Sequence, residues 1–338
     1  GGPTMIPTAF TLMMFPAACA IATSAACGGE TGATILAAGG AGDHIVRYRL
    51  DDGEVIDHFV ADGVSSLNFP FALEFGPDGN IYVSGWQSDA IHRFDAETGE
   101  PLGTFIAPGS GGLDGPTGLV FHPDGFVLVS SNATNRVLKY DASTGTFLGT
   151  FIEPGSGGLD GPQDLTWGPD GHLYVSSYNN DQVLRYGYDG ESGTFIDVFV
   201  TEASGGLDGP SHTVFRDEVF IVVSARSDAV LKYNSRTGEF IEVLVPSASG
   251  GLDYPHYMQF DDGILYLAGT PNNNILMYDA DSGSFLGQLV APGSGGLDGP
   301  RGLLILPVTK TCCEDLNSDG DVSIGDLLQL LAAWGSCE

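Results

Sequence analysis

The body of this chain lacks cysteine, because none of its five cysteines lies between Cys27 and Cys312. A folded core over that stretch must be held by burial and hydrogen bonds, without disulfides. Basic residues are also scarce: 12 Lys+Arg stand against 43 Asp+Glu, which gives a net charge of −31. This charge repels phosphate backbones and anionic membrane surfaces, so we expect no nucleic-acid partner.

Long uncharged runs are rare as well, and the main one reads MIPTAFTLMMFPAACAIATSAA from Met5 to Ala26. It ends in small residues and is similar to a secretory signal peptide cleaved near Ala26. We therefore assign residues 1–27 to a signal-like segment and expect a secreted or cell-surface protein, with no membrane insertion after cleavage. A buried or membrane-spanning helix is the alternative, although Pro16 and the shortness of the run count against it. Lipid attachment at Cys27 is a second alternative.

Glycine, in contrast, is abundant, with 50 residues of 338, and much of it lies in a repeated phrase. Ser-Gly-Gly-Leu-Asp-Gly-Pro recurs almost unchanged at intervals of 45 to 48 residues, and LNFP is a weaker copy. The leucines of the phrase are Leu67, Leu113, Leu159, Leu207, Leu252 and Leu297. Each interval holds four strand-like runs; after Leu113 they are GLVF, FVLVSS, RVLKYD and TFLGTFI. A four-stranded repeat of this length is typical of one β-propeller blade.

The number of strand-like runs predicts six blades. Five complete units start at the phrase leucines from Leu67 to Leu252. Three further runs precede them, ATILAAGG, HIVRYRL and EVIDHFV, and one run, GLLILPV, follows them. Three strands plus one complete a sixth blade, in which the C-terminal strand is innermost and closes the ring. The sequence therefore predicts an all-β, six-bladed propeller of four-stranded blades over residues 28–310.

The units resemble NHL repeats and the related gluconolactonase-like propellers. The resemblance is carried by strings such as GPDGNIYVSGWQSDAIHRFDAETG, residues 76–99, and GPDGHLYVSSYNNDQVLRYG, residues 168–187. It covers about residues 30–308 and implies the propeller architecture. Because propellers of this kind include binding scaffolds, lactonases and lyases, the resemblance leaves the function open.

Aligning the six inner strands on their prolines predicts the residues that line the central channel. The second and fourth residues after each proline form a small and polar face. Asp164 and His212 share one level in neighbouring blades, and His256 and Arg301 lie one residue earlier, so we expect these four side chains to converge at one channel mouth. The candidate catalytic residues are Asp164, His212 and His256, and the candidate substrate-binding residues are Arg301, Tyr257, Gln259 and Glu74. A divalent metal or a general-base pair would give this group a function. The alternative is that a water-filled channel is polar without having any function.

Residues 311–338 form a different segment with a pattern of oxygen ligands. The stretch from Asp315 to Asp326 matches an EF-hand calcium loop, with Gly320 at its sharp turn. The predicted Ca²⁺ ligands are Asp315, Asn317, Asp319, Asp321 through its backbone carbonyl, and Asp326. A helix carrying Trp334 is expected to follow the loop. A solvated acidic turn is the alternative.

This segment resembles half of a type I dockerin, a module that binds cohesin through two such loops. A cohesin-like partner is therefore one expectation, but one loop is more typical of an attachment or sorting tail. A disulfide between Cys337 and either Cys312 or Cys313 is also expected.

These patterns favour a secreted or cell-surface propeller that binds or scaffolds a partner and carries a calcium-stabilised tail. The sequence does not distinguish a protein, glycan or small-molecule ligand. The alternative is a lactonase-like hydrolase or lyase, with a second divalent metal or an acid/base pair in the channel.

Overall fold

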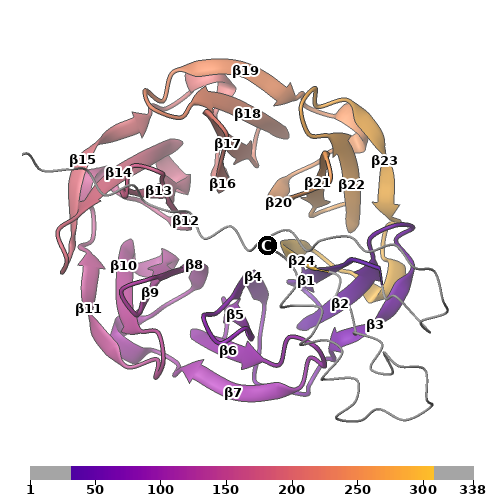
Figure 1. The fold of residues 1–338 in the computed structure, drawn as a ribbon, viewed down its shortest axis with the longest axis horizontal. Helices are drawn as coiled ribbons and strands as arrows, with labels where there is room; N and C mark the ends of the chain where they lie inside the picture. Colours follow the sequence, from indigo (N-terminus) through magenta and orange to yellow (C-terminus); the bar gives the residue numbers. More distant parts are fainter. Residues whose placement is uncertain (1–31, 308–338) are drawn as a thin grey trace, which may run out of the picture. The chain divides into compact units, whose positions relative to one another are not determined.

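The computed structural model describes residues 32–307, which form six four-stranded antiparallel sheets arranged as blades around a central channel (Figure 1). The predicted all-β, six-bladed propeller is confirmed. The signal-like segment, the calcium loop with its helix, and all five cysteines lie outside the described residues.

Three blades form one half of the ring, and the first of them joins its two ends. Blade 1 comprises β24 (Pro300–Leu306), β1 (Thr34–Gly39), β2 (His44–Arg49) and β3 (Val55–Val60). Blade 2 comprises β4 (Pro70–Phe75), β5 (Ile81–Gly85), β6 (Ala90–Phe94) and β7 (Pro101–Ile106). Blade 3 comprises β8 (Pro116–His122), β9 (Phe126–Ser131), β10 (Arg136–Asp141) and β11 (Phe147–Ile152).

The other three blades follow in chain order around the ring. Blade 4 comprises β12 (Pro162–Trp167), β13 (Leu173–Ser177), β14 (Gln182–Tyr188) and β15 (Gly193–Val200). Blade 5 comprises β16 (Pro210–Arg216), β17 (Val219–Ser224), β18 (Ala229–Asn234) and β19 (Phe240–Val245). Blade 6 comprises β20 (Pro255–Asp261), β21 (Ile264–Gly269), β22 (Asn274–Asp279) and β23 (Phe285–Val290).

The ring closes as the strand count predicts. The last strand, β24, pairs antiparallel with β1, so that Leu304 lies opposite Leu36 and Ile305 opposite Ile35. In blade 1 the C-terminal strand is thus the innermost, and the closure leaves no open sheet edge at the join.

The repeated phrase forms the crossing from one blade to the next. Its Ser-Gly-Gly part makes a 3-10 turn after each of the last five blades. These turns are η1 (Ser110–Gly112), η3 (Ser156–Gly158), η5 (Ser204–Gly206), η6 (Ser249–Gly251) and η7 (Ser294–Gly296). Gly111 shows why glycine is required: its φ is 64°, and a Cβ there would lie 2.2 Å from the Phe147 ring. Two further turns, η2 (Asn132–Thr134) and η4 (Tyr178–Asn180), join strands within blades 3 and 4.

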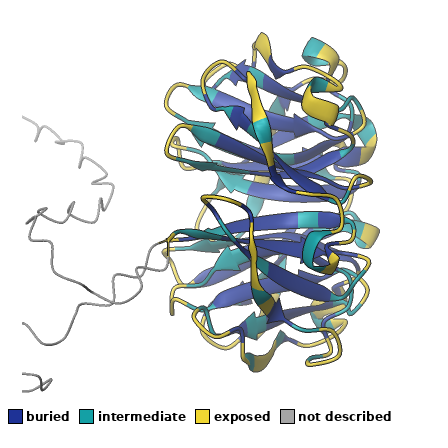
Figure 2. Cartoon of the chain, turned by 90° about the vertical axis from the view of Figure 1, so that its right-hand side faces the viewer, coloured by how far each residue is buried: buried dark blue, intermediate teal, exposed yellow. Residues whose placement is uncertain are grey.

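Five buried tyrosines on the third strands tie neighbouring blades together. Each donates a hydrogen bond of 2.7 Å from its hydroxyl to the serine carbonyl of a phrase. The pairs are Tyr48–Ser294, Tyr140–Ser110, Tyr186–Ser156, Tyr233–Ser204 and Tyr278–Ser249. Blade 2 has Phe94 at this position. Figure 2 shows that burial runs through the strands, whereas the exposed residues lie mainly in loops.

A bulge in every inner strand decides where the channel side chains point. The pairing with the neighbouring strand shifts within the first residues after the proline, as between Pro162 and Leu165 and between Pro255 and Met258. A bulge redirects the side chains beside it. The side chain of the first residue after each proline therefore does not follow the regular in-and-out alternation of the later residues in the strand.

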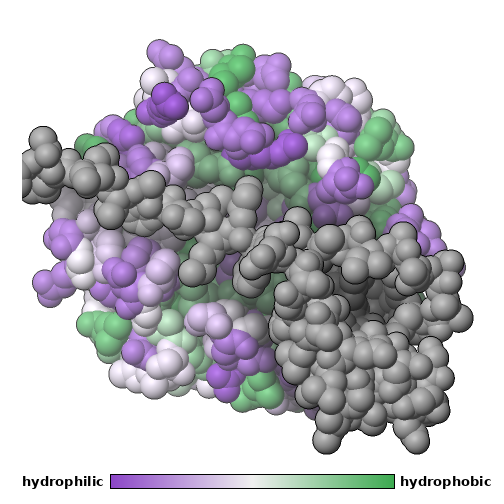
Figure 3. Space-filling view, in the orientation of Figure 1, coloured by the Kyte–Doolittle hydropathy of each residue, from purple (hydrophilic) through white to green (hydrophobic). Residues whose placement is uncertain are grey.

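Within residues 32–307, no helix is long and apolar enough to span a membrane. On the visible part of the face in Figure 3, hydrophilic and hydrophobic residues are interspersed.

Candidate functional site

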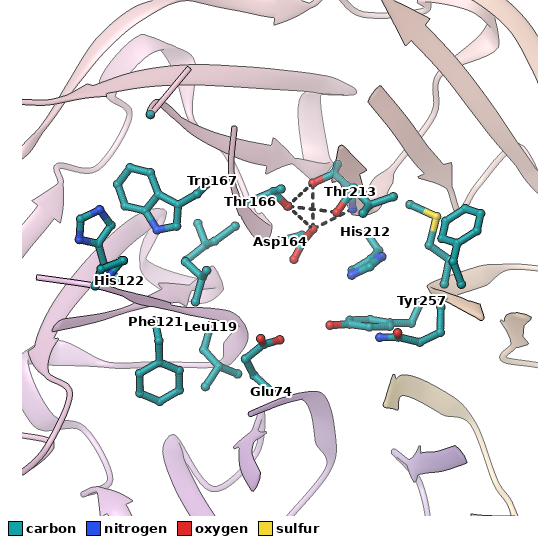
Figure 4. Close-up of a pocket in the computed structure, with 18 residues that line it drawn as sticks. Glu74, Leu119, Phe121, His122, Asp164, Thr166, Trp167, His212, Thr213 and Tyr257 are labelled. Atoms are coloured by element: carbon teal, nitrogen blue, oxygen red, sulfur yellow. Dashed lines mark hydrogen bonds between the residues drawn. The ribbon is translucent and has the colours of Figure 1, made fainter. Parts of the chain in front are cut away.

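The channel contains a cavity of about 640 Å³, lined by the inner strands of blades 2 to 6 (Figure 4). This volume lies within the range of small-molecule sites, roughly 300–1,000 Å³. One part of the wall is polar, and its side chains are Glu74, Asp164, His212, Tyr257 and Gln259. We name this space the channel cavity.

Asp164 is a buried carboxylate held by one of its two oxygens. The backbone N–H of Thr213 donates to Asp164 Oδ2 at 2.7 Å, and the Thr213 hydroxyl donates to it at 2.9 Å. The Thr166 hydroxyl also donates to this atom, at 3.3 Å. Three donors thus converge on one oxygen of this side chain. Figure 4 shows the other oxygen directed into the cavity, where it is available to a ligand.

Glu74 lies across the cavity from Asp164 and is held in its neutral form. Burial, and secondly the negative charge of Asp164, raise the pKa of Glu74 to about 8. Two carboxyl groups that share one site disfavour double ionisation. At neutral pH Glu74 therefore offers a proton to the cavity.

His212 and Tyr257 complete the polar wall and pack against each other, with ring centroids 3.7 Å apart. Burial lowers the pKa of His212, although the charge of Asp164 opposes this effect. The pKa of Tyr257 is raised well above its usual value by burial, and further by Glu74 and Asp164. Both side chains are therefore neutral at physiological pH. His212 Nδ1 is buried and makes no hydrogen bond with any described residue.

The opposite part of the wall is aromatic and carries no cation. Trp167 and His122 lie with ring centroids 4.7 Å apart, and Phe121 stands beside them in the lining. Among the described lining residues, none is a lysine or an arginine. The cavity thus combines an acidic, hydrogen-bonding end with an aromatic wall.

The structure brings five of the seven predicted site residues together. The other two, His256 and Arg301, line a separate cavity of about 170 Å³. The expectation that Asp164, His212, His256 and Arg301 converge at one channel mouth is wrong, because the first two line the channel cavity and the last two line the other. His256 and Arg301 directly follow their prolines, and the bulge directs them to the end of the channel where the inner strands begin. Gln259 lines the channel cavity but is partly engaged, since its Nε2 donates to the Leu303 carbonyl at 3.1 Å.

The described residues provide no obvious metal centre. Within residues 32–307, no group of three His, Cys, Asp or Glu side chains is placed to hold a metal ion. Asp164 and His212 supply two ligand types in the channel cavity, but Glu74, which could be the third ligand of a catalytic zinc site, lies across the cavity and is not grouped with them. A second divalent metal in the channel therefore stays a prediction that the donor set does not favour.

Sequence reasoning missed the aromatic wall of the channel cavity. Trp167 and Phe121 lie five residues after their prolines, at positions that the sequence pattern assigns to the core. His122 follows at the end of β8. Tryptophan replaces at position 167 the phenylalanine that is usual at this place in the repeat. This departure from the repeat could have indicated the aromatic wall.

Comparison with solved structures shows the fold at low sequence identity. A chain of the nidogen/laminin complex is 18% identical with a TM-score of 0.64, over 83% of this chain and 100% of that one. A protein of unknown function from Bacteroides caccae is 14% identical with a TM-score of 0.61, over 81% and 99%. A catalytically inactive virginiamycin B lyase from Staphylococcus aureus is 17% identical with a TM-score of 0.49, over 80% and 79%. No protein-family model and no curated protein matches the chain. These likenesses extend to the fold alone.

Proposed function

We propose that this chain is a secreted or cell-surface propeller that binds a small organic molecule in the channel cavity. The observation that carries the proposal is the cavity of about 640 Å³, in which acidic and other polar side chains face an aromatic wall. A few convergent polar groups on an otherwise apolar wall are typical of ligand sites.

The chemistry of the wall favours a ligand with a cationic head and an apolar body. One oxygen of Asp164 accepts no hydrogen bond from a described residue, and the lining residues offer it no positive partner. A cation placed between Asp164 and Glu74 would offset the repulsion between the two carboxyl groups, which adds to the effect of burial on Glu74. Aromatic faces such as Trp167, in the opposite part of the wall, would cover the apolar body.

A titration of tryptophan fluorescence with benzylammonium tests this proposal. Benzyl alcohol has the same body without the charge and is the matched control ligand. Since a charge-assisted hydrogen bond contributes about 1.5–3 kcal/mol, benzylammonium should bind roughly ten- to a hundredfold more tightly. Asp164→Asn should remove most of this difference, whereas Glu202→Gln, on an exposed loop, should leave it unchanged.

The Trp167→Phe variant identifies the site in the same titration. It should lose the fluorescence response to benzylammonium, while Trp86→Phe should keep it, because Trp86 does not line the channel cavity. Equal affinity for the charged and the neutral ligand, or a response that survives Trp167→Phe, would overturn the proposal.

A second candidate function is a hydrolase or lyase, favoured by the pair of Glu74 and Asp164. Two carboxyl groups in a shared cavity, one of them with its pKa raised to about 8, are an arrangement that enzymes use for acid and base catalysis. Turnover of a chromogenic lactone tests it. Both Glu74→Gln and Asp164→Asn should then lower the rate by at least ~10²-fold. Binding of benzylammonium without any turnover would leave the protein as a binding module.

The calcium-binding tail and the secreted location are part of this proposal and rest on sequence alone. Asp315, Asn317, Asp319, Asp321 and Asp326 would hold Ca²⁺ through oxygen ligands. Attachment through this tail would place the binding propeller at a surface or in an assembly. Calcium titration by calorimetry, repeated with Asp315→Ala, measures the site directly.

A further inference from the structure

The second cavity, of about 170 Å³, lies at the end of the channel where the inner strands begin. Five aromatic rings and one cation characterise its lining: Phe69, Phe71, Trp86, Tyr178, Tyr254 and Arg301. We name it the arginine cavity. It shares no lining residue with the channel cavity.

Arg301 is a cation without a counter-ion. Within residues 32–307, no carboxylate lies at ion-pair distance from its guanidinium, although the whole chain has 43 acidic residues. Its Nη1 donates to His256 Nε2, and the guanidinium carbon lies 5.6 Å from the Phe69 ring centre and 5.8 Å from that of Phe71. Nε is buried and makes no hydrogen bond with a described residue. A cation in this setting normally has an anionic partner.

Two further polar side chains are buried at the same cavity, each with one polar atom that makes no hydrogen bond among the described residues. His256 is 2% exposed, and its Nδ1 makes no hydrogen bond among the described residues. Burial, and next the charge of Arg301, hold the pKa of His256 well below its usual value. Gln163 is 9% exposed, and its side-chain oxygen is also unpaired there. Arg301 is therefore the only charged group in the described lining.

The repeated phrase has a different residue before its proline at the two blade crossings that line this cavity. Four blade crossings have a glycine with positive φ just before the proline of the inner strand. These are Gly115, Gly161, Gly209 and Gly299, with φ of 61°, 63°, 66° and 59°. The other two have Phe69, with φ of 55°, and Tyr254, with φ of 47°. Left-handed backbone is strained for a residue other than glycine. Both strained aromatic residues line the arginine cavity, and such outliers concentrate at functional sites.

We propose that the arginine cavity binds the carboxylate of a small aromatic acid, with the carboxylate on Arg301 and the ring among the aromatic side chains. The Nε–Nη2 edge of Arg301 makes no hydrogen bond with residues 32–307, and such an edge matches a carboxylate in a bidentate pair. A cationic ligand is excluded by the charge of Arg301. A dianion is disfavoured, because one guanidinium would have to neutralise it in a protein of net charge −31.

The two cavities thus have opposite selectivity, and this inference goes beyond the proposed function. The channel cavity has acidic groups and no cation, whereas the arginine cavity has a cation and no acidic group among its described residues. Each also contains one tryptophan, Trp167 in the first and Trp86 in the second. The two sites can therefore be followed separately in the same protein.

A fluorescence titration of the full chain with benzoate tests the inference. Benzoate should quench Trp86 in a saturable way, and benzyl alcohol should not. The response should disappear in Trp86→Phe but persist in Trp167→Phe, and calorimetry should still detect benzoate binding to Trp86→Phe. Arg301→Met should weaken benzoate binding at least tenfold while leaving benzylammonium binding unchanged. Arg301→Lys keeps the charge but loses the bidentate edge, so it should recover only part of the affinity.

Tyr254→Gly gives a second variant in which Arg301 is intact. It restores the residue type found in four other blades, so it should fold, yet it should weaken benzoate binding several-fold. Absence of benzoate binding to the wild type would overturn the inference. A benzoate affinity equal to that of the wild type in both Arg301→Met and Tyr254→Gly would also overturn it. Neither result would affect the benzylammonium response, which tests the channel cavity alone.

Discussion

Replacing Glu74 by glutamine tests the electrostatics of the channel cavity through the pH dependence of stability. In the folded protein this carboxyl has a pKa of about 8, because burial and then the charge of Asp164 oppose its ionisation. In the unfolded chain it titrates near pH ~4.3. The stability that depends on the neutral carboxyl is therefore fully present below that pH. It is lost as the pH rises towards the folded pKa.

The size of the effect follows from the same shift. One pKa unit corresponds to about 1.4 kcal/mol, so the full shift would be roughly 5 kcal/mol. Glu74 borders a cavity and is half-buried, so water reduces the energy that corresponds to this pKa shift. We expect the wild type to lose about 2–4 kcal/mol of unfolding free energy from this group between about pH 4.5 and 8. The Glu74→Gln variant should not show this loss of unfolding free energy.

Urea unfolding of wild type and variant over this pH range measures the difference. The gain of Glu74→Gln over wild type should grow with pH and level off above about pH 8. Glu202→Gln, at an exposed loop position, should show no such growth. A difference between Glu74→Gln and wild type that does not vary with pH would refute the assignment of a neutral, buried carboxyl.

Three further predictions concern other parts of the chain. Tyr254→Gly removes backbone strain and should change the unfolding free energy by less than ~1 kcal/mol, whereas truncating a buried aromatic usually costs about 3–5 kcal/mol. Tyr140→Phe loses the hydrogen bond to the Ser110 carbonyl and should cost about 1 kcal/mol in urea unfolding. Chelating calcium should remove hydrogen-exchange protection from the helix carrying Trp334 and leave the blades protected, with Kd on the order of 10⁻⁴–10⁻³ M; protection unaffected by chelator would contradict it.

The blades were predictable because the repeat determines them directly. The phrase spacing gives the unit length, and the three-plus-one strand count gives the closure between β24 and β1. The alternation after each proline also predicts that Asp164, His212 and Glu74 face the channel, as they do. Local pattern and ring geometry agree at these positions, so sequence reasoning succeeds.

The division of the channel into two cavities was not predictable in the same way. It depends on the bulge after each proline, which moves His256 and Arg301 to the other end of the channel. A bulge shifts pairing by one residue, and a simple alternation pattern does not contain that shift. The changes at Phe69 and Tyr254 were visible in the sequence, but their meaning required the left-handed backbone.

Anomalous diffraction from a crystal soaked with 4-bromobenzylammonium tests the central claim, that the channel cavity is a ligand site for an organic cation. We predict a bromine peak beside Trp167 and Phe121, with the ammonium group directed to Asp164 and Glu74. A bromine peak in the arginine cavity or on the outer surface, with none in the channel cavity, would contradict the claim.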